Sequence, residues 1–271
     1  MIIQTAAEGE PRLAITMDEH TALAGDFARA FGNASFEHIE PREIMLYVIS
    51  QHDKGWVAFD AALKTDPRTG LPYNLVETPA EDITRTSTGS PDFHEKYHAY
   101  AALISSMHSW GLYNGRYGMS DKVLIDTIPA NERHLADRML EGELARQKRL
   151  KAALAMDPET SEWIASDRLF QNYKQLQFFD TLALYFNRTH EGAREPATFA
   201  HVPISAKHDV TVGIRPHAPG VYALLPFPFG GQSVEFSFSG RYVKPHPGSR
   251  DFGQALVAAP RIQQRFTVIA G

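Results

Sequence analysis

The sequence predicts a mainly α protein, in which a helical bundle is followed by a small β-rich C-terminal part. Apolar residues recur at helical spacing in most segments up to about residue 190. After about residue 195 the chain changes to short runs rich in β-branched and aromatic residues. We therefore expect a helical, metal-binding domain over residues 1–195 and a β-rich extension packed on it over residues 196–271.

The first two predicted helices each carry a histidine on an apolar face. In "ITMDEHTALAGDFARAF", Thr16 and Glu19 have the spacing of a capping box, and His20 lies one turn into the helix. In "EPREIMLYVISQHD", Pro41 occupies the first helical position, and His52 shares the apolar face near the end. Both histidines are therefore expected at buried positions.

Three further helices follow a long irregular segment. Residues 57–90 are rich in Pro, Gly, Thr and Asp without a sustained period, which predicts a loop. Ser90 and Pro91 are typical of a helix start, and the helix after them carries His108 on its apolar face. "NERHLADRMLEGELARQKRLKAALAM" is a charged amphipathic helix. "DRLFQNYKQLQFFDTLALYFNRTH" is apolar nearly all round and predicts a buried helix, with Asp180 as the one acid in its stripe.

The C-terminal part contains four predicted strands: "HDVTVGI", "VYALLPF", "SVEFSFSGRYV" and "RFTVIAG". Within the third, "VEFSFS" alternates with the period of two that is typical of a strand. Its histidines have no ligand spacing and are expected at the surface: His201, His208, His217 and His246.

Composition excludes several classes of function. The 271 residues include no cysteine, which excludes zinc ribbons and disulfide frameworks and is compatible with a cytoplasmic location. The net charge is −5 and basic residues are not clustered, so nucleic acid is not an expected partner. No apolar run is long enough to span a membrane, and the N-terminus lacks the features of a signal peptide. A small-molecule substrate is the expected partner, and the oligomeric state is open.

Five residues on apolar faces have side chains that bind metals: His20, His52, Asp53, His108 and Asp180. Each alone has a simpler interpretation, because a single buried histidine is usually hydrogen-bonded in the core. Burying a carboxylate without a partner costs several kcal/mol, however, and five such residues are hard to explain separately. One or two divalent transition ions would satisfy them together, and imidazole with carboxylate suits Fe, Mn, Ni, Co or Zn.

The order His, His-Asp, Asp on separate helices resembles the HD-domain superfamily of metal-dependent phosphohydrolases. More narrowly, "HDKGW", "DPRTGLPYN", "QLQFFDTLALYF" and "LPFPF" resemble a bacterial family of uncharacterised HD-like proteins known as DUF3891. The resemblance implies an HD-like helical bundle with a metal held by His20, His52, Asp53 and Asp180.

The likeness to the superfamily includes two departures. Many HD phosphohydrolases follow the His-Asp pair with Ile-Gly-Lys, whereas this chain has Lys-Gly-Trp. His108 resembles the extra histidines of binuclear HD proteins, for which His98 is a second candidate, while His94 is expected to be solvated.

Besides Asp53, Lys54 is a candidate catalytic residue, as a general acid or an anion-binding group, although a solvated lysine at a helix end is equally compatible with its position.

Three functions remain open at this point. The first is a metal-dependent hydrolase of HD type that acts on a phosphoester or related small molecule through a metal-bound water. The second is an HD-type diiron oxygenase. The third is a non-catalytic helical domain that uses the same cluster to bind a metal or another ligand.

Overall fold

A computed structural model describes residues 1–245 and 252–271, with side chains for all of these except 252–254. His246, expected at the surface, lies outside the described residues. The α-helices are α1 (Met17–Ala30), α2 (Arg42–Ile49), α3 (Val57–Ala61), α4 (Ala80–Glu95), α5 (Ala99–Tyr113), α6 (Gly115–Gly118), α7 (Arg133–Leu154), α8 (Pro158–Trp163), α9 (Ser166–Arg188) and α10 (Phe252–Ala258). Short 3₁₀ segments are Lys54–Trp56, Leu75–Glu77, Leu124–Thr127 and Glu191–Ala193.

Seven strands form one curled sheet in the order β1-β2-β8-β9-β7-β6-β5. β7 and β9 pair in parallel, and the other neighbours are antiparallel. The strands are β1 (Ile2–Ile3), β2 (Arg12–Ile15), β5 (Ala197–Pro203), β6 (Asp209–Ala218), β7 (Val221–Leu225), β8 (Ser233–Val243) and β9 (Arg261–Ala270). A separate hairpin joins β3 (Thr65–Asp66) to β4 (Leu71–Pro72).

The expectation of a mainly α protein with a small β-rich part is therefore wrong, because the chain has an α/β fold with a large mixed sheet. The four strands predicted in the C-terminal part are present as β6, β7, β8 and β9. The sequence patterns missed β5 and the N-terminal strands β1 and β2. The latter are two and four residues long, and β2 joins the sheet only through its pairing with β8, more than 200 residues away. No local period reveals such a pairing.

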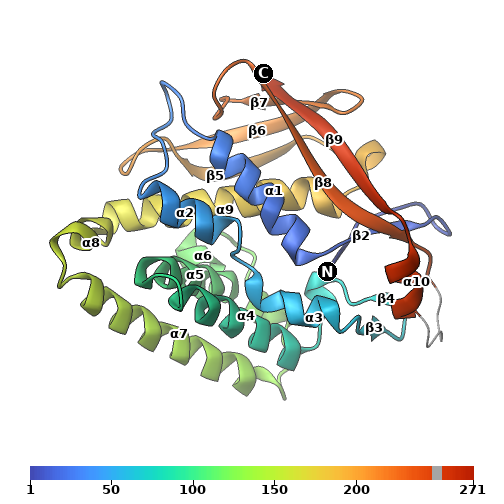
Figure 1. The fold of residues 1–271 in the computed structure, drawn as a ribbon, viewed down its shortest axis with the longest axis horizontal. Helices are drawn as coiled ribbons and strands as arrows, with labels where there is room; N and C mark the ends of the chain where they lie inside the picture. Colours follow the sequence, from blue (N-terminus) through green and yellow to red (C-terminus); the bar gives the residue numbers. More distant parts are fainter. Residues whose placement is uncertain (246–251) are drawn as a thin grey trace.

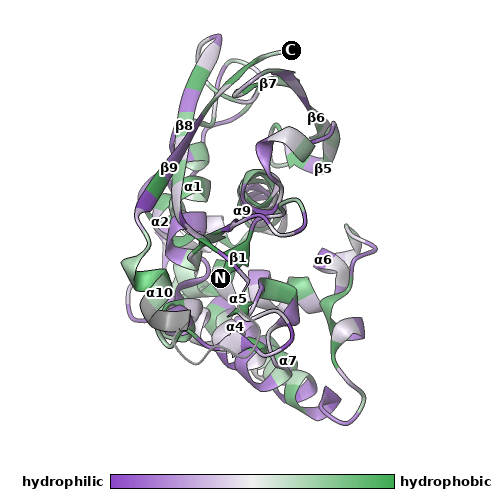
Figure 2. Cartoon of the chain, turned by 90° about the vertical axis from the view of Figure 1, so that its right-hand side faces the viewer, coloured by the Kyte–Doolittle hydropathy of each residue, from purple (hydrophilic) through white to green (hydrophobic). Residues whose placement is uncertain are grey.

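The molecule is layered, with α1 and α9 between the sheet and the remaining helices (Figure 1). The curled sheet covers one side of this pair in the view turned by 90° (Figure 2). A cluster of aromatic rings joins the two layers, and the rings of Phe186 in α9 and Phe266 in β9 stack at 3.8 Å between centroids. Phe27 of α1 makes an edge contact with Phe236 of β8 at 4.6 Å. The sheet is thus part of the core that holds α1 and α9.

Residues 57–90 are not the long loop that was expected, and the predicted helix start at Ser90 and Pro91 is wrong. α3, the β3–β4 hairpin and the 3₁₀ segment Leu75–Glu77 fill the first part. α4 follows them and continues through Pro91. A proline inside a helix leaves the carbonyl four residues earlier without its N–H partner. Here that carbonyl, of Ser87, accepts a hydrogen bond from the Ser109 hydroxyl of α5 at 2.7 Å. A contact between helices therefore compensates for a sequence that resembles a loop.

The N-terminal strands β1 and β2 share one sheet with the C-terminal strands β5 to β9, so the two ends of the described chain are structurally connected. The division at residue 195 lies between the end of α9 and the start of β5. The assignment of residues 1–195 to a helical domain and of residues 196–271 to an extension packed on it stays a prediction. Throughout the described ranges, every helix is either too short or too polar to cross a bilayer.

Candidate metal centre

His20 is fixed by the first turn of α1. Thr16 caps the helix, and its hydroxyl accepts a hydrogen bond from the backbone N–H of Glu19 at 3.3 Å, as the capping-box pattern predicts. One turn of this helix then directs the fully buried His20 toward α9. The local sequence therefore determines where the imidazole enters the core.

His52 and Asp53 follow α2 rather than lying on it, because the helix ends at Ile49. Two close backbone approaches hold this turn in place. A Cβ at Gly25 of α1 would lie 2.6 Å from the Cβ of Ser50, so α1 and the end of α2 come unusually near each other. A Cβ at Gly55 would lie 2.1 Å from the backbone oxygen of Thr86 in α4. The glycine of "HDKGW" is thus required by packing.

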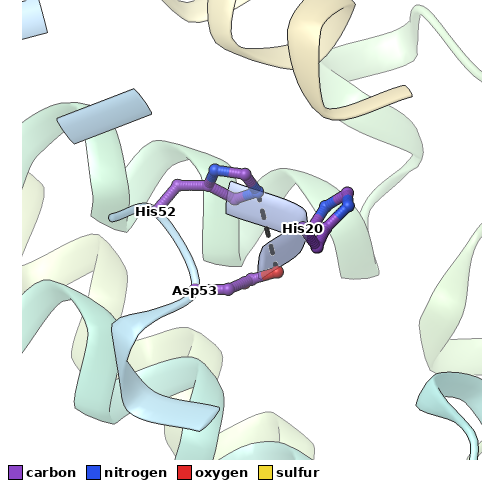
Figure 3. Close-up of side chains that lie close together, drawn as sticks. All are labelled: His20, His52 and Asp53. Atoms are coloured by element: carbon purple, nitrogen blue, oxygen red, sulfur yellow. Dashed lines mark ion pairs between the residues drawn. The ribbon is translucent and has the colours of Figure 1, made fainter. Parts of the chain in front are cut away.

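The five candidate ligands converge in space. Asp180 of α9 lies with its Oδ1 3.2 Å from His20 Nε2 and 3.8 Å from His52 Nε2. Asp53 Oδ2 is 3.6 Å from His52 Nε2, and Figure 3 shows this pair with His20 beside it. The His52 and His108 rings are 5.1 Å apart. Two overlapping groups have ligand atoms within 4.8 Å of one another: His20, His52 and Asp53, and His52, His108 and Asp180.

Each histidine is held from behind through Nδ1. His20 Nδ1 lies 2.9 Å from the side-chain oxygen of Asn187, and His52 Nδ1 lies 2.8 Å from the backbone oxygen of Ile49. Both contacts place the ring proton on Nδ1 and leave Nε2 with a free lone pair. Histidines that bind metals are typically oriented in this way by a second hydrogen bond.

His108 fits the same pattern if the amide of Gln177 is turned by 180°. The amide nitrogen of Gln177 is placed 2.7 Å from His108 Nδ1, while its oxygen is buried without a partner among the described residues. Amide nitrogen and oxygen differ little in shape, and their assignment follows the hydrogen-bond network. With the oxygen toward His108, it accepts the Nδ1 proton and leaves His108 Nε2 free.

The residues fit a divalent metal because one buried nitrogen lacks any other partner. His52 Nε2 is fully enclosed and has no hydrogen-bond partner in the described structure. Its distances of 3.6 Å to Asp53 and 3.8 Å to Asp180 are too long for hydrogen bonds. Two ligands about 2.1 Å from one tetrahedral ion are separated by about 3.4 Å. The spacing is that of ligands around an ion rather than of donors beside acceptors.

The carboxylates and imidazoles shift each other's protonation. Burial lowers the pKa of His52, but the carboxylates of Asp53 and Asp180 outweigh burial and raise it to about 9. Burial raises the pKa of Asp180, but its contacts with His20 and His52 outweigh this and hold the pKa well below its usual range. Burial raises the pKa of Asp53 and lowers that of His108 to about 3. A proton on His52 Nε2 has no acceptor within hydrogen-bond distance. A metal cation in the centre would take the place of this proton.

Three other predicted candidates lie outside these groups. Lys54 is directed away from the centre: its ammonium lies 3.1 Å from Asp18 and 5.8 Å from the ring centroid of Phe93. His98 caps α5, with its Nδ1 accepting from the backbone N–H of Tyr100 at 3.0 Å. His94 is fully buried, so the expectation that it is solvated is wrong. Its helix continues upstream of Ser90, which places His94 in the last turn of α4 rather than at a helix start.

The sequence patterns missed two residues of the centre. Asn187 lies seven residues after Asp180 in α9, so a search for polar residues on the same helical face would have found it. Arg116 lies with a guanidinium nitrogen 3.6 Å from Asp180 Oδ2. No periodic pattern predicts Arg116, because it belongs to an irregular turn after α5.

Solvent reaches the centre beside Asp53 and Arg116, whose side chains are 15% and 21% exposed. The other members are buried. A cavity of about 410 Å³ lies elsewhere, between the start of α1, α3, β8 and α10, and is lined by residues such as Met1, Asp60 and Leu256. In this cavity, the carboxylate of Asp60 accepts two hydrogen bonds, one from the N-terminal ammonium of Met1 at 2.6 Å and one from the backbone N–H of Met17 at 2.7 Å.

The fold and the centre define an α/β protein with a buried His/Asp cluster suited to a transition metal. The sequence matches the family described as "Protein of unknown function (DUF3891)" over residues 1–245. The chain belongs to this family, as the resemblance of its motifs predicts. Comparison with the curated proteins and with the solved structures finds no match.

Proposed function

We propose that this chain is a metal-dependent hydrolase of HD type, which acts on a small phosphoester in the cytoplasm. The observation that carries the proposal is the buried, unpartnered Nε2 of His52 between two carboxylates, with the imidazoles of the centre anchored from behind. The order His20, His52-Asp53, Asp180 on separate elements supports the HD assignment.

In this proposal His20, His52, Asp53 and Asp180 hold one divalent transition metal, and His108 contributes to a second. Such an ion polarises a phosphoryl oxygen and acidifies water when bound. Asn187, Gln177 and the backbone of Ile49 fix the orientation of the three imidazoles.

Asp53 has a second role in the proposed reaction. It is the more exposed carboxylate of the centre, at 15% against 6% for Asp180. In the proposal, one of its oxygens binds the metal, and the other orients the attacking water and accepts its proton. The general-acid role of Lys54 stays a prediction and requires its ammonium to leave Asp18, because the two are paired at 3.1 Å.

Two observations favour the alternatives. The two overlapping ligand groups share His52 and offer donors that suit iron, which supports an HD-type diiron oxygenase. A cavity of about 410 Å³ lies away from the centre, which supports a non-catalytic metal or ligand site.

The test is an activity screen on protein reconstituted separately with Fe, Mn, Ni, Co and Zn. The substrates are p-nitrophenyl phosphate, bis-p-nitrophenyl phosphate and a set of nucleotides, with His52→Ala as the inactive variant. The proposal predicts hydrolysis that requires metal and disappears in the variant. Oxygen consumption by the iron-loaded protein without hydrolysis would indicate the oxygenase, and a metal-loaded protein inert in both assays would indicate the non-catalytic site.

A further inference from the structure

The four residues of the short segment α6, which follows α5, adopt left-handed backbone conformations, so α6 is a left-handed turn rather than a right-handed α-helix. Gly115, Arg116, Tyr117 and Gly118 have φ values of 58°, 51°, 58° and 83°. Glycine adopts this region freely, but residues with a Cβ rarely do, and almost never in succession. Two neighbouring non-glycine residues in this conformation persist only when surrounding contacts hold them, and such strain is concentrated at functional sites.

Tyr117 supplies those contacts. Its ring packs against Trp110, Phe170 and Tyr173 at centroid distances of 4.7, 5.4 and 5.1 Å. Its hydroxyl donates a hydrogen bond to the Gln147 side chain at 3.3 Å. The turn is therefore anchored on one side by an aromatic cluster, and it presents the preceding residue, Arg116, to the metal centre.

The Arg116 guanidinium has unused donors at this position. Its only ion pair in the described structure, with Asp180 at 3.6 Å, is too long for a hydrogen bond. A guanidinium offers five N–H donors in a planar fork that matches phosphate oxygens. The side chain is 21% exposed, so it faces both the centre and its solvent-accessible side.

A second donor without a partner lies nearby. Tyr173 is on the same face of α9, two turns before Asp180, and its hydroxyl is buried without a hydrogen bond to any described residue. That hydroxyl lies against Gly111 of α5, where a Cβ would be 2.1 Å from it. Gly111 is one turn after His108, so the hydroxyl lies next to the helical face that carries this ligand.

We infer that Arg116, with Tyr173, binds the phosphoryl oxygens of the substrate and holds them against the metal ligands. This inference rests on the proposed function and names the substrate class as an anion with phosphoryl oxygens next to the scissile bond. The strained turn is then explained, since it is the conformation that brings a guanidinium to Asp180 while Tyr117 stays in the core.

The test measures binding of inorganic phosphate by calorimetry on the full chain, reconstituted with its metal. Arg116→Gln and Arg116→Gly are each expected to weaken phosphate binding at least tenfold with the metal content unchanged. Arg116→Gly also relieves the left-handed strain, so it should unfold at the same or a higher temperature than wild type. Tyr173→Phe keeps the ring packing and should weaken binding severalfold. Arg138→Gln, an exposed residue of α7, is the matched control.

Four results would overturn the inference. Equal phosphate affinity in wild type and Arg116→Gln, with full metal content in both, would remove the role of Arg116 and leave the proposed hydrolase standing. Loss of metal in Arg116→Gln would show that the guanidinium only supports Asp180. Acetate binding as tightly as phosphate would assign Arg116 to carboxylates instead. Wild-type protein that takes up no metal would overturn the proposed function itself, and with it this inference.

Discussion

Asn187 acts at the scale of a single hydrogen bond. Its side-chain oxygen lies 2.9 Å from His20 Nδ1 and so determines which imidazole nitrogen faces the centre. Both residues are fully buried, so water does not replace this contact when the amide is removed.

Asn187→Ala should therefore weaken metal binding by about 10–100-fold, the usual effect of removing the partner of a metal-binding histidine. Competition with a chromophoric chelator measures the affinity. Asn131→Ala, at an exposed position before α7, is the control and should bind as wild type does. An unchanged affinity in Asn187→Ala would mean that His20 is not a ligand through Nε2.

His94 is a buried histidine outside the ligand groups. Its Nδ1 lies 2.8 Å from the backbone oxygen of Ser90, and its Nε2 has no partner among the described residues. Tyr47 and Phe93 surround the ring. Burial lowers the pKa of His94 to about 4, so the neutral form is the one that the fold accommodates.

The pKa of His94 predicts a loss of stability in acid. Because the pKa in the folded state is below the ordinary value of 6.5, the stabilisation is complete above pH 6.5 and is lost as the pH falls toward 4. The whole shift corresponds to about 3 kcal/mol. In His94→Gln, the free energy of unfolding, measured by urea titration, should depend less on pH between 6.5 and 4 than it does in wild type. The exposed His134→Gln should leave the slope unchanged, and an equal slope in all three proteins would contradict the shift.

At the scale of elements, the turn that carries His52 and Asp53 depends on α4. The backbone N–H of Gly55 donates to the hydroxyl of Ser90 at 3.0 Å, and the backbone of Gly55 lies against Thr86 and Gly89. The small and hydroxylated residues of α4 allow this approach, since Thr84, Thr86 and Ser87 return their hydroxyls to the helix's own carbonyls.

Gly55→Ala should destabilise the protein by about 1–3 kcal/mol, because backbone atoms rather than a flexible side chain meet the new methyl group. Metal affinity should fall with it, since the ligand turn must move. Gly142→Ala is the matched control: Gly142 lies in an exposed part of α7 with no atom within 4 Å of a new Cβ. That variant should gain about 0.5–1 kcal/mol. Thermal unfolding of both variants measures the difference, and a neutral Gly55→Ala would contradict the packing.

The same elements show what local patterns predict. The capping box of α1 and the buried stripe of α9 were visible in the sequence, because each depends on residues within two or three turns. They sufficed to select His20 and Asp180, which the structure brings within 3.2 Å of each other. α4 was missed because its Thr, Ser, Gly and Pro content is typical of loops. The carbonyl that Pro91 leaves without an N–H partner accepts a hydrogen bond from Ser109 of another helix, which local patterns do not reveal. Arg116 was missed because left-handed turns have no periodic signal.

At the scale of the whole molecule, the sheet is the feature that the sequence could not supply. The pairing of β2 with β8 and the parallel pairing of β7 with β9 are both long-range or crossover contacts. The alternation of apolar residues predicts strands but not their neighbours. The helices α1 and α9, which carry two of the ligands, pack their aromatic side chains against this sheet.

A fragment of residues 1–195 should therefore fail to fold. Removing residues 196–271 would leave β2 without its partner β8 and expose the rings of Phe27 and Phe186. Circular dichroism and amide exchange on the purified fragment should show little fixed tertiary structure. A fragment that unfolds cooperatively and retains metal would instead establish residues 1–195 as an independent domain.

The most direct measurement of the central claim is the metal content of the untagged protein, obtained by elemental mass spectrometry. Wild type is compared with His52→Ala, Asp180→Ala and the control His134→Ala. We predict one or two equivalents of a transition metal in wild type and the control, and a loss of most of it in the other two. Folded wild-type protein without metal after reconstitution, or full metal content in His52→Ala and Asp180→Ala, would contradict a metal centre at these residues.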